Sequence, residues 1–350
     1  GSSKAFDATL LILHAFRMPT FFAMAGFFTC LVIGKKGPEN WLRDRTRRIL
    51  LPFLVCYVFF TPLMTLLTGR LSGHASPGDL FAAVADMFVG KSQLYHFWFL
   101  YFLFSYSLIW YIFRKYAPQA LLDADAHLSR SVQRHAGSPA RLVLAGTLIS
   151  FALMMNERSG FISYSPFLIP KIRVFVYFLF FFYAGTLMFR ARNALHATYR
   201  AWPKMLLAAV PLAILYVVCV FSLQSGKASS WWWLADLSDT ALCWVMLFGS
   251  TGFCLATFDT ERKWIRRWAD AGYWIYLVHY PLVLGMVKLL SGVQVPLILK
   301  FLLVVGTTIV IGYVSFLHLV RGRAIGRALF GNGDVVGRAR PMPVLSGMVS

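Results

Sequence analysis

Charged side chains are scarce in this sequence. Asp, Glu, Lys and Arg make up only 14% of its 350 residues, while 58% of the residues are hydrophobic. Soluble domains carry about 25% charged residues. The composition therefore excludes a soluble globule and indicates a polytopic membrane protein, in which lipid faces most side chains.

Acidic residues are the scarcest charged groups. The chain has 14 Asp and Glu but 34 Lys and Arg, which gives a formal net charge of +20. In a soluble protein this excess would suggest a nucleic-acid partner. Here the basic residues fall in short blocks between apolar runs, a pattern typical of the cytoplasmic loops of membrane proteins. We therefore expect no nucleic-acid partner.

Cysteine is also infrequent, and the sequence contains no Cys-x-x-Cys pair. All five cysteines lie in apolar runs: Cys30, Cys56, Cys219, Cys243 and Cys254. This placement predicts small buried hydrophobic residues and indicates neither a disulfide framework nor a metal site. We expect the protein to act without a bound metal.

What the sequence has in abundance is long apolar runs. Nine of them are each close to the roughly 20 residues that a bilayer core requires. They cover residues 10–33, 49–68, 95–113, 141–156, 172–189, 205–223, 239–258, 272–290 and 297–320. The run at 141–156 is short and is followed by polar residues. The sequence thus predicts an all-α polytopic membrane protein with nine transmembrane helices in this chain.

Most Lys and Arg residues lie in alternate loops and after residue 320, which places those loops and the C-terminus in the cytoplasm. Nine spans would then leave Gly1 outside the cytoplasm, although no signal peptide is visible. The simplest explanation is a further first helix, giving ten spans in the full-length protein and an N-terminally truncated chain here. A nine-span protein with a translocated N-terminus is the alternative. Residues 331–350 read as a disordered cytoplasmic tail.

Four ionisable residues inside the apolar runs require an explanation, because such groups cost about 2.5–3.5 kcal/mol in lipid. His14 and Arg17 lie one helical turn apart in HAFRMPTFFAMAGFF and so share a helix face. His96 opens YHFWFLYF, and His279 lies in GYWIYLVHYP. A lone buried histidine is more often a satisfied core group than a catalyst, and that interpretation stays open.

Acids are missing from the middle of the spans, since Glu157, Asp236 and Asp239 fall at span ends. Ion-coupled transporters usually carry Asp or Glu inside their spans. Basic groups without acids instead favour an anionic ligand, such as a phosphate-bearing cofactor or a carboxylate.

The block WLRDRTRRILLPF supports the same ligand class. Arg45, Arg47 and Arg48 lie close together at the start of a predicted helix on the cytoplasmic side. Arginine binds phosphate oxygens bidentately. Ordinary topology signalling or contact with lipid headgroups would produce the same block, so both interpretations remain open.

Five segments together resemble membrane acyltransferase family 3. FRMPTFFAMAGFF is similar to the second-helix motif of that family, and RTRRILLPF is similar to its arginine-rich entry to the third helix. HFWFL, RVFVYFLFFFYAGTLM and GYWIYLVHYPL follow in the family's order, between about residues 10 and 320. The lead-in at Arg17 and the HFWFL form look most like family members that succinylate osmoregulated periplasmic glucans. The resemblance implies that residues 1–330 form a membrane acyltransferase domain.

The resemblance also implies a function in the bacterial inner membrane. An acyl group, succinyl or acetyl, would pass from cytoplasmic acyl-CoA to a hydroxyl of a periplasmic glucan. The expected partners are therefore acyl-CoA, the glycan acceptor and membrane lipid. Such a transfer needs cationic groups for the cofactor phosphates and for the oxyanion.

Site residues follow from this expectation. Arg45, Arg47 and Arg48 would bind the phosphates of coenzyme A. His14 and Arg17 would line the acyl channel, with Arg17 pairing with a succinyl carboxylate. His96 and His279 would orient the acceptor or the thioester. We also expect Gly26 to allow close approach of a neighbouring helix or ligand.

Two departures from the family pattern are visible. Family members begin with a helix that carries an R-x10-H-like motif and the presumed catalytic histidine; His14 falls in the next helix and is not that residue. Ala25 stands where the family often has serine. Two other functions stay open: acetylation of another surface polysaccharide or lipid-linked sugar, and glycan transport without chemistry.

Overall fold

The computed structural model describes residues 3–71, 78, 81, 85, 93–155, 167–226, 229–258 and 263–330. Within these ranges the regular elements are all helical, which confirms the predicted all-α fold. The predicted disordered tail, residues 331–350, lies outside the described residues, as does Glu157.

Eight helical segments are long and apolar enough to cross a membrane, among the residues that the structure describes. They are built on α1 (Lys4–Lys36), α3 (Leu51–Leu71), α5 (Trp98–Tyr116), α8 (Ile172–Arg190), α10 (Trp202–Gln224), α11 (Trp232–Thr257), α12 (Lys263–Leu290) and α13 (Leu297–Ser315). Each corresponds to one of the predicted spans. The chain is therefore a polytopic membrane protein.

The ninth predicted span is a shorter helix. The helix α7 (Pro139–Met154) has 16 residues, which at 1.5 Å per residue gives about 24 Å. The hydrocarbon core of a bilayer is about 30 Å thick. This segment is thus apolar but shorter than the other eight.

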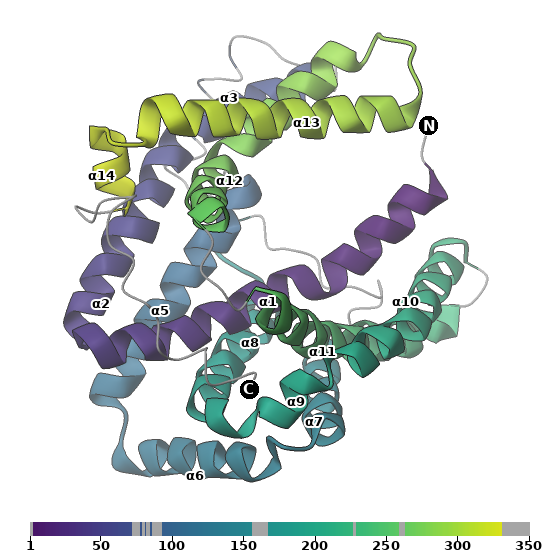
Figure 1. The fold of residues 1–350 in the computed structure, drawn as a ribbon. Coiled ribbons are helices and arrows are strands. Elements are labelled where there is room, and N and C mark those ends of the chain that lie inside the picture. The colour runs from purple at the N-terminus through teal and green to yellow at the C-terminus, as the bar shows by residue number, and fades with distance from the viewer. Residues whose placement is uncertain are drawn as a thin grey trace.

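Short elements connect or extend the long ones. They are α2 (Pro38–Arg45), α6 (Gln119–His135), α9 (His196–Arg200), α14 (Ala324–Phe330), the 3-10 turns η2 (Tyr95–Phe97), η3 (Arg192–Ala194) and η4 (Ser229–Trp231), and the π turns η1 (Thr46–Leu50) and η5 (Phe316–Val320). Figure 1 shows α6 running across one edge of the molecule, at a steep angle to α5. The helix α6 lies in the segment between the predicted spans 95–113 and 141–156.

The helix α1 crosses the middle of the molecule (Figure 1) and packs closely on α8. A Cβ atom added at Gly26 would lie 1.8 Å from the carbonyl oxygen of Phe182, and one added at Gly185 would lie 1.8 Å from that of Ala23. Only glycine allows two helix backbones to approach this closely. The close approach predicted at Gly26 is therefore confirmed, and the neighbour is a helix.

Aromatic side chains fill the space around this crossing. The ring of Phe22 lies 5.1 Å from that of Phe178 and 5.3 Å from that of Tyr106, centroid to centroid. Phe22 and Tyr106 are fully buried. Rings at these separations pack favourably beyond the area they bury. This cluster fixes α1 against α5 and α8, and so fixes the depth and the rotation of the polar residues on α1.

Candidate functional site

His96 and His279 meet across a helix interface. His96 lies in η2, just before α5, and His279 lies inside α12. Their ring centroids are 4.8 Å apart, in an edge-to-face arrangement. The fold thus brings together two histidines that the sequence analysis singled out in separate motifs.

Both imidazoles are oriented by backbone carbonyl groups. The Nε2 atom of His96 lies 3.3 Å from the carbonyl oxygen of Leu277, and the Nδ1 atom of His279 lies 2.7 Å from that of Tyr276. A carbonyl oxygen only accepts, so each of these nitrogens donates an N–H. In the neutral ring the other nitrogen then carries a lone pair. The Nδ1 atom of His96 is buried and has no hydrogen-bond partner among the described residues, so its acceptor capacity is unused in this structure.

The backbone at His96 is held in an uncommon conformation. The preceding residue, Tyr95, has φ of 46°, a left-handed conformation that costs energy in any residue with a Cβ. Two contacts offset this cost. The hydroxyl groups of Tyr95 and Thr65 lie 3.0 Å apart, and the Tyr276 hydroxyl donates to the carbonyl oxygen of His96 at 2.6 Å. Strained backbone of this kind clusters at functional sites.

Arg17 belongs to the same neighbourhood. It is exposed on α1 and lies close enough to His279 for its charge to act on that imidazole. A cationic side chain beside two imidazoles forms a place where a carboxylate or a developing oxyanion is favoured.

His14 lines a separate small cavity. The cavity has a volume of about 20 Å³, enough for about one water molecule. Trp98, Tyr177 and Asp239 are also in its wall. Of the four residues predicted for catalysis, His96 and His279 come together. The charge of Arg17 acts on His279, and His14 lies one turn of α1 away from Arg17.

Asp239 lies deeper in its helix than the predicted span placed it. The predicted span began at residue 239, but α11 begins at Trp232, so Asp239 lies two turns inside the helix. Its side chain is 3% exposed and that of Asp236 is fully buried. The helix extends further because these polar residues pack into the bundle instead of forming a loop. The expectation that acids are confined to span ends is therefore wrong for Asp239.

The arginine block lies where α2 passes into α3 through the π turn η1, which carries Arg47 and Arg48. Both side chains are exposed, and Arg45 is partly buried with its guanidinium 5.8 Å from the centre of the Trp41 ring. Exposed arginines of this kind are free to bind an anion bidentately.

One helix joins the arginine block to the histidine pair. On α12, the Tyr273 hydroxyl donates to the carbonyl oxygen of Arg48 at 2.6 Å, and the Tyr276 hydroxyl donates to that of His96 at the same distance. The two tyrosines are three residues apart, a rise of about 4.5 Å along the helix. The two predicted parts of the site are therefore supported by a single turn of α12.

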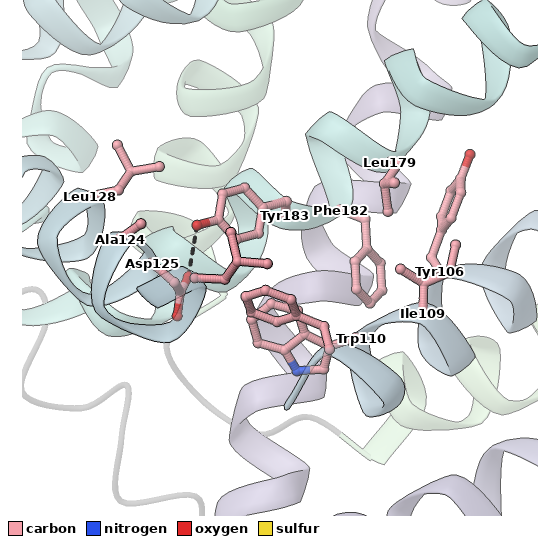
Figure 2. A pocket seen from close by; sticks show the side chains of 11 residues that line it. Tyr106, Ile109, Trp110, Ala124, Asp125, Leu128, Leu179, Phe182 and Tyr183 are labelled. Carbon is pink, nitrogen blue, oxygen red and sulfur yellow. Dashed lines mark hydrogen bonds between the residues drawn. The ribbon is translucent and has the colours of Figure 1, made fainter. Parts of the chain in front are cut away.

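A larger pocket lies away from these residues, between α5, α6 and α8. It has a volume of about 360 Å³ and a mostly apolar wall. Figure 2 shows the Tyr183 hydroxyl directed at Asp125 on one side and the ring of Phe182 on the other. Because it shares no lining residue with the histidine pair or the arginine block, it is a separate feature of the fold.

Asp125, on α6, is the polar group of this pocket and is fully engaged. It accepts from the Tyr183 hydroxyl at 2.7 Å and from Arg190 at 2.8 and 2.9 Å, with Arg114 at 3.5 Å. Burial raises the pKa of this carboxyl, but the hydrogen bonds and the two cationic charges outweigh it, so its pKa lies below the usual value. This network fastens α6 to α8 and is structural.

Comparison with known proteins gives the family. The acyltransferase domain family matches residues 2–317. "Glucans biosynthesis protein C" of Escherichia coli strain SMS-3-5 / SECEC is 24% identical over 284 residues, which cover 78% of this chain and 70% of that protein. The protein of the same name from strain K12 / DH10B is similar at the same identity and coverage. No solved structure matches this chain. The family match covers nearly all of the described helices, and this chain belongs to the acyltransferase domain family as a polytopic membrane protein.

Proposed function

We propose that this protein is an O-acyltransferase of the bacterial inner membrane. It moves an acyl group, succinyl in the favoured case, from cytoplasmic acyl-CoA to a hydroxyl group of a periplasmic glucan. The family supports acyl transfer, and the similarity to proteins named for glucan biosynthesis supports the acceptor class. The observation that carries the proposal is the meeting of His96 and His279, and the charge of Arg17 acts on His279.

The reaction makes one bond and breaks another. The acceptor hydroxyl oxygen attacks the thioester carbonyl carbon, its proton passes to a base, and the coenzyme A thiolate leaves with the C–S bonding pair. A hydroxyl group must be aligned by an acceptor atom before it attacks. The Nδ1 atom of His96, which has no hydrogen-bond partner among the described residues, would be such an acceptor. The ring of His279 lies against the ring of His96. These two histidines would orient the acceptor.

Arg17 would recognise the acyl group. A succinyl group ends in a carboxylate, which pairs with a guanidinium through charge-assisted hydrogen bonds. In a low-dielectric setting the same charge also stabilises the thioester oxyanion as it forms. His14, one turn earlier on α1, faces a separate small cavity, so the acyl group is assigned to Arg17 alone. An acetyl donor has no such carboxylate, so Arg17 would then contribute only to the oxyanion.

Arg45, Arg47 and Arg48 would bind the phosphates of coenzyme A. Two of these side chains are exposed, and the turn that carries them shares a supporting helix with His96. Phosphate binding and acceptor orientation would occur toward opposite ends of α3, because Tyr95 contacts Thr65, 17 residues beyond Arg48 and a rise of about 25 Å, with the basic loops and the C-terminus in the cytoplasm.

The test compares periplasmic glucans from cells with and without the gene, by anion-exchange chromatography and mass spectrometry. Succinylation adds negative charge and acetylation adds none. Loss of the anionic glucans with the gene supports the proposal. Unchanged glucans contradict the glucan acceptor and direct the search to acetylated surface polysaccharides. Transfer of radiolabel from succinyl-CoA to glucan by the purified protein then separates an enzyme from a glycan transporter.

A further inference from the structure

We propose that two tyrosine hydroxyl groups of α12 are positioning groups for the two parts of the site. Tyr273 fixes the turn that carries Arg47 and Arg48. Tyr276 fixes the backbone of His96. The inference rests on the proposed function, in which the arginine block binds the donor and His96 orients the acceptor.

Tyr273 acts on an unusual helical turn. In the π turn η1 (Thr46–Leu50) each N–H bonds five residues back, so the helix is locally wider; such turns are frequent at functional sites. The Tyr273 hydroxyl donates to the carbonyl oxygen of Arg48 at 2.6 Å, over 225 residues of sequence. This bond ties the widened turn to α12. The arginine side chains therefore leave the helix from a backbone that is held in place.

Tyr276 acts on the backbone at the start of α5. Its hydroxyl donates to the carbonyl oxygen of His96 at 2.6 Å, directly after Tyr95 with its left-handed φ. Its own carbonyl oxygen accepts from Nδ1 of His279. One residue therefore contacts both histidines of the pair, one through its side chain and the other through its backbone.

The two hydroxyl groups can be removed separately. Tyr→Phe keeps the ring, so the packing of Tyr276 on His96 and Phe99, at 5.5 and 5.9 Å between centroids, is retained. The hydrogen bond to the carbonyl is lost in each variant, and Tyr276→Phe also loses the hydrogen bond from the backbone N–H of Leu100. The two carbonyls belong to different parts of the site. A general disturbance of α12 would instead affect both parts together.

The experiment compares Tyr273→Phe and Tyr276→Phe with the unchanged protein in lipid nanodiscs. Coenzyme A binding is measured by calorimetry, and acyl transfer is measured with succinyl-CoA and purified periplasmic glucan. We expect Tyr273→Phe to weaken coenzyme A binding and raise KM for succinyl-CoA by between about twofold and tenfold, the range for one hydrogen bond, with kcat unchanged. Tyr276→Phe lowers kcat by a similar factor and leaves coenzyme A affinity unchanged.

Equal losses in both variants, or no change in either, overturn the proposal. Arg48→Gln separates it from the proposed function. If Arg48→Gln weakens coenzyme A binding and Tyr273→Phe does not, the role of Tyr273 is wrong and donor binding by Arg48 stands. If Arg48→Gln leaves coenzyme A binding unchanged, donor binding by Arg48 is wrong and the role of Tyr273 falls with it.

A third tyrosine serves as the matched control. Tyr313 stacks on Trp268 with 4.7 Å between ring centroids, and its hydroxyl has no hydrogen bond within the described part of the chain. Tyr313→Phe is expected to leave both coenzyme A affinity and kcat unchanged. A change equal to that in Tyr273→Phe or Tyr276→Phe would show a general effect of losing a hydroxyl group and would overturn the proposal.

Discussion

The imidazole rings of His96 and His279 lie 4.8 Å apart, although they come from opposite parts of the sequence. Each ring donates one N–H to a backbone carbonyl of α12. That arrangement fixes which nitrogen of each neutral ring is left as a hydrogen-bond acceptor.

His279→Ala should reduce acyl transfer while the protein remains inserted and folded. The variant loses the imidazole ring that lies against His96. That ring is also the group on which the charge of Arg17 acts. We expect kcat to fall by at least about tenfold, which is less than the roughly 100- to 10,000-fold effect of a group that itself transfers a proton, because His279 would orient the acceptor. The measurement is labelled succinyl transfer by purified protein. His318→Ala, in the π turn η5, is the control. Undiminished transfer by His279→Ala would show that His279 is a structural residue of the core and takes no part in acyl transfer.

Arg17→Ala should remove the preference for succinyl over acetyl donors. The guanidinium pairs with a carboxylate only in the succinyl case, and a hydrogen bond to a charged group contributes about 1.5–3 kcal/mol. KM for succinyl-CoA should therefore rise by about tenfold to a hundredfold, with a much smaller change for acetyl-CoA. Arg17→Lys keeps the charge and should recover part of the loss. Full activity of Arg17→Ala with succinyl-CoA would contradict the assignment.

Replacement of Arg45 and Arg48 by Gln should raise KM for acyl-CoA with little change in kcat. These side chains would act on the phosphates, far from the reacting carbonyl, so they contribute to binding in the ground state and the transition state alike. Two charge-assisted contacts predict a rise of at least about tenfold. Arg130→Gln, exposed on α6, is the control for loss of an exposed positive charge. An unchanged KM would reject the phosphate role.

Gly185→Ala should destabilise the protein, because its new methyl group would lie 1.8 Å from the carbonyl oxygen of Ala23 on the facing helix. The helices α1 and α8 would have to separate, and overpacking of this kind costs about 1–3 kcal/mol or more. Thermal unfolding in detergent measures the effect as a lower Tm. Gly306→Ala, in α13 with no atom within 4 Å of the new Cβ, is the matched control and should gain up to about 1 kcal/mol from helix propensity.

Asp125→Asn should lower stability at neutral pH by about 2 to 3 kcal/mol, since the ion pair with Arg190 loses its negative charge. The pKa of Asp125 is lowered in the folded protein, so its stabilising contribution is fully present above the unfolded pKa of about 3.9 and is lost as the pH falls through the folded value. The Tm of the unchanged protein should thus fall on acidification more than that of Asp125→Asn. Asp123→Asn, exposed and bonded to Gln119, is the control, and parallel pH profiles would contradict the prediction.

The sequence predicted the individual helices well and their polar contacts poorly. Eight of the nine predicted spans are helices long and apolar enough to cross a membrane, because apolar length is a local property of the chain. The start of α11 was missed, since Asp236, Ser238 and Asp239 read as loop residues until the bundle that buries them is known. The motif residues could each be identified from the sequence. The hydrogen bonds of Tyr273 and Tyr276 could not, because a bond to a carbonyl group far away in the sequence produces no recognisable residue pattern.

By itself the sequence determined that this is an all-α membrane protein and which residues carry the family's motifs, because hydrophobicity and order along the chain need no partner to be read. Only the tertiary structure decided which polar groups meet. The pairing of His96 with His279, the cavity shared by His14 and Asp239, and the engagement of Asp125 by Arg190 all depend on how each helix is rotated and against which neighbour it packs. That rotation is set by contacts such as the glycine crossing of α1 and α8, in which side chains from distant segments fit together.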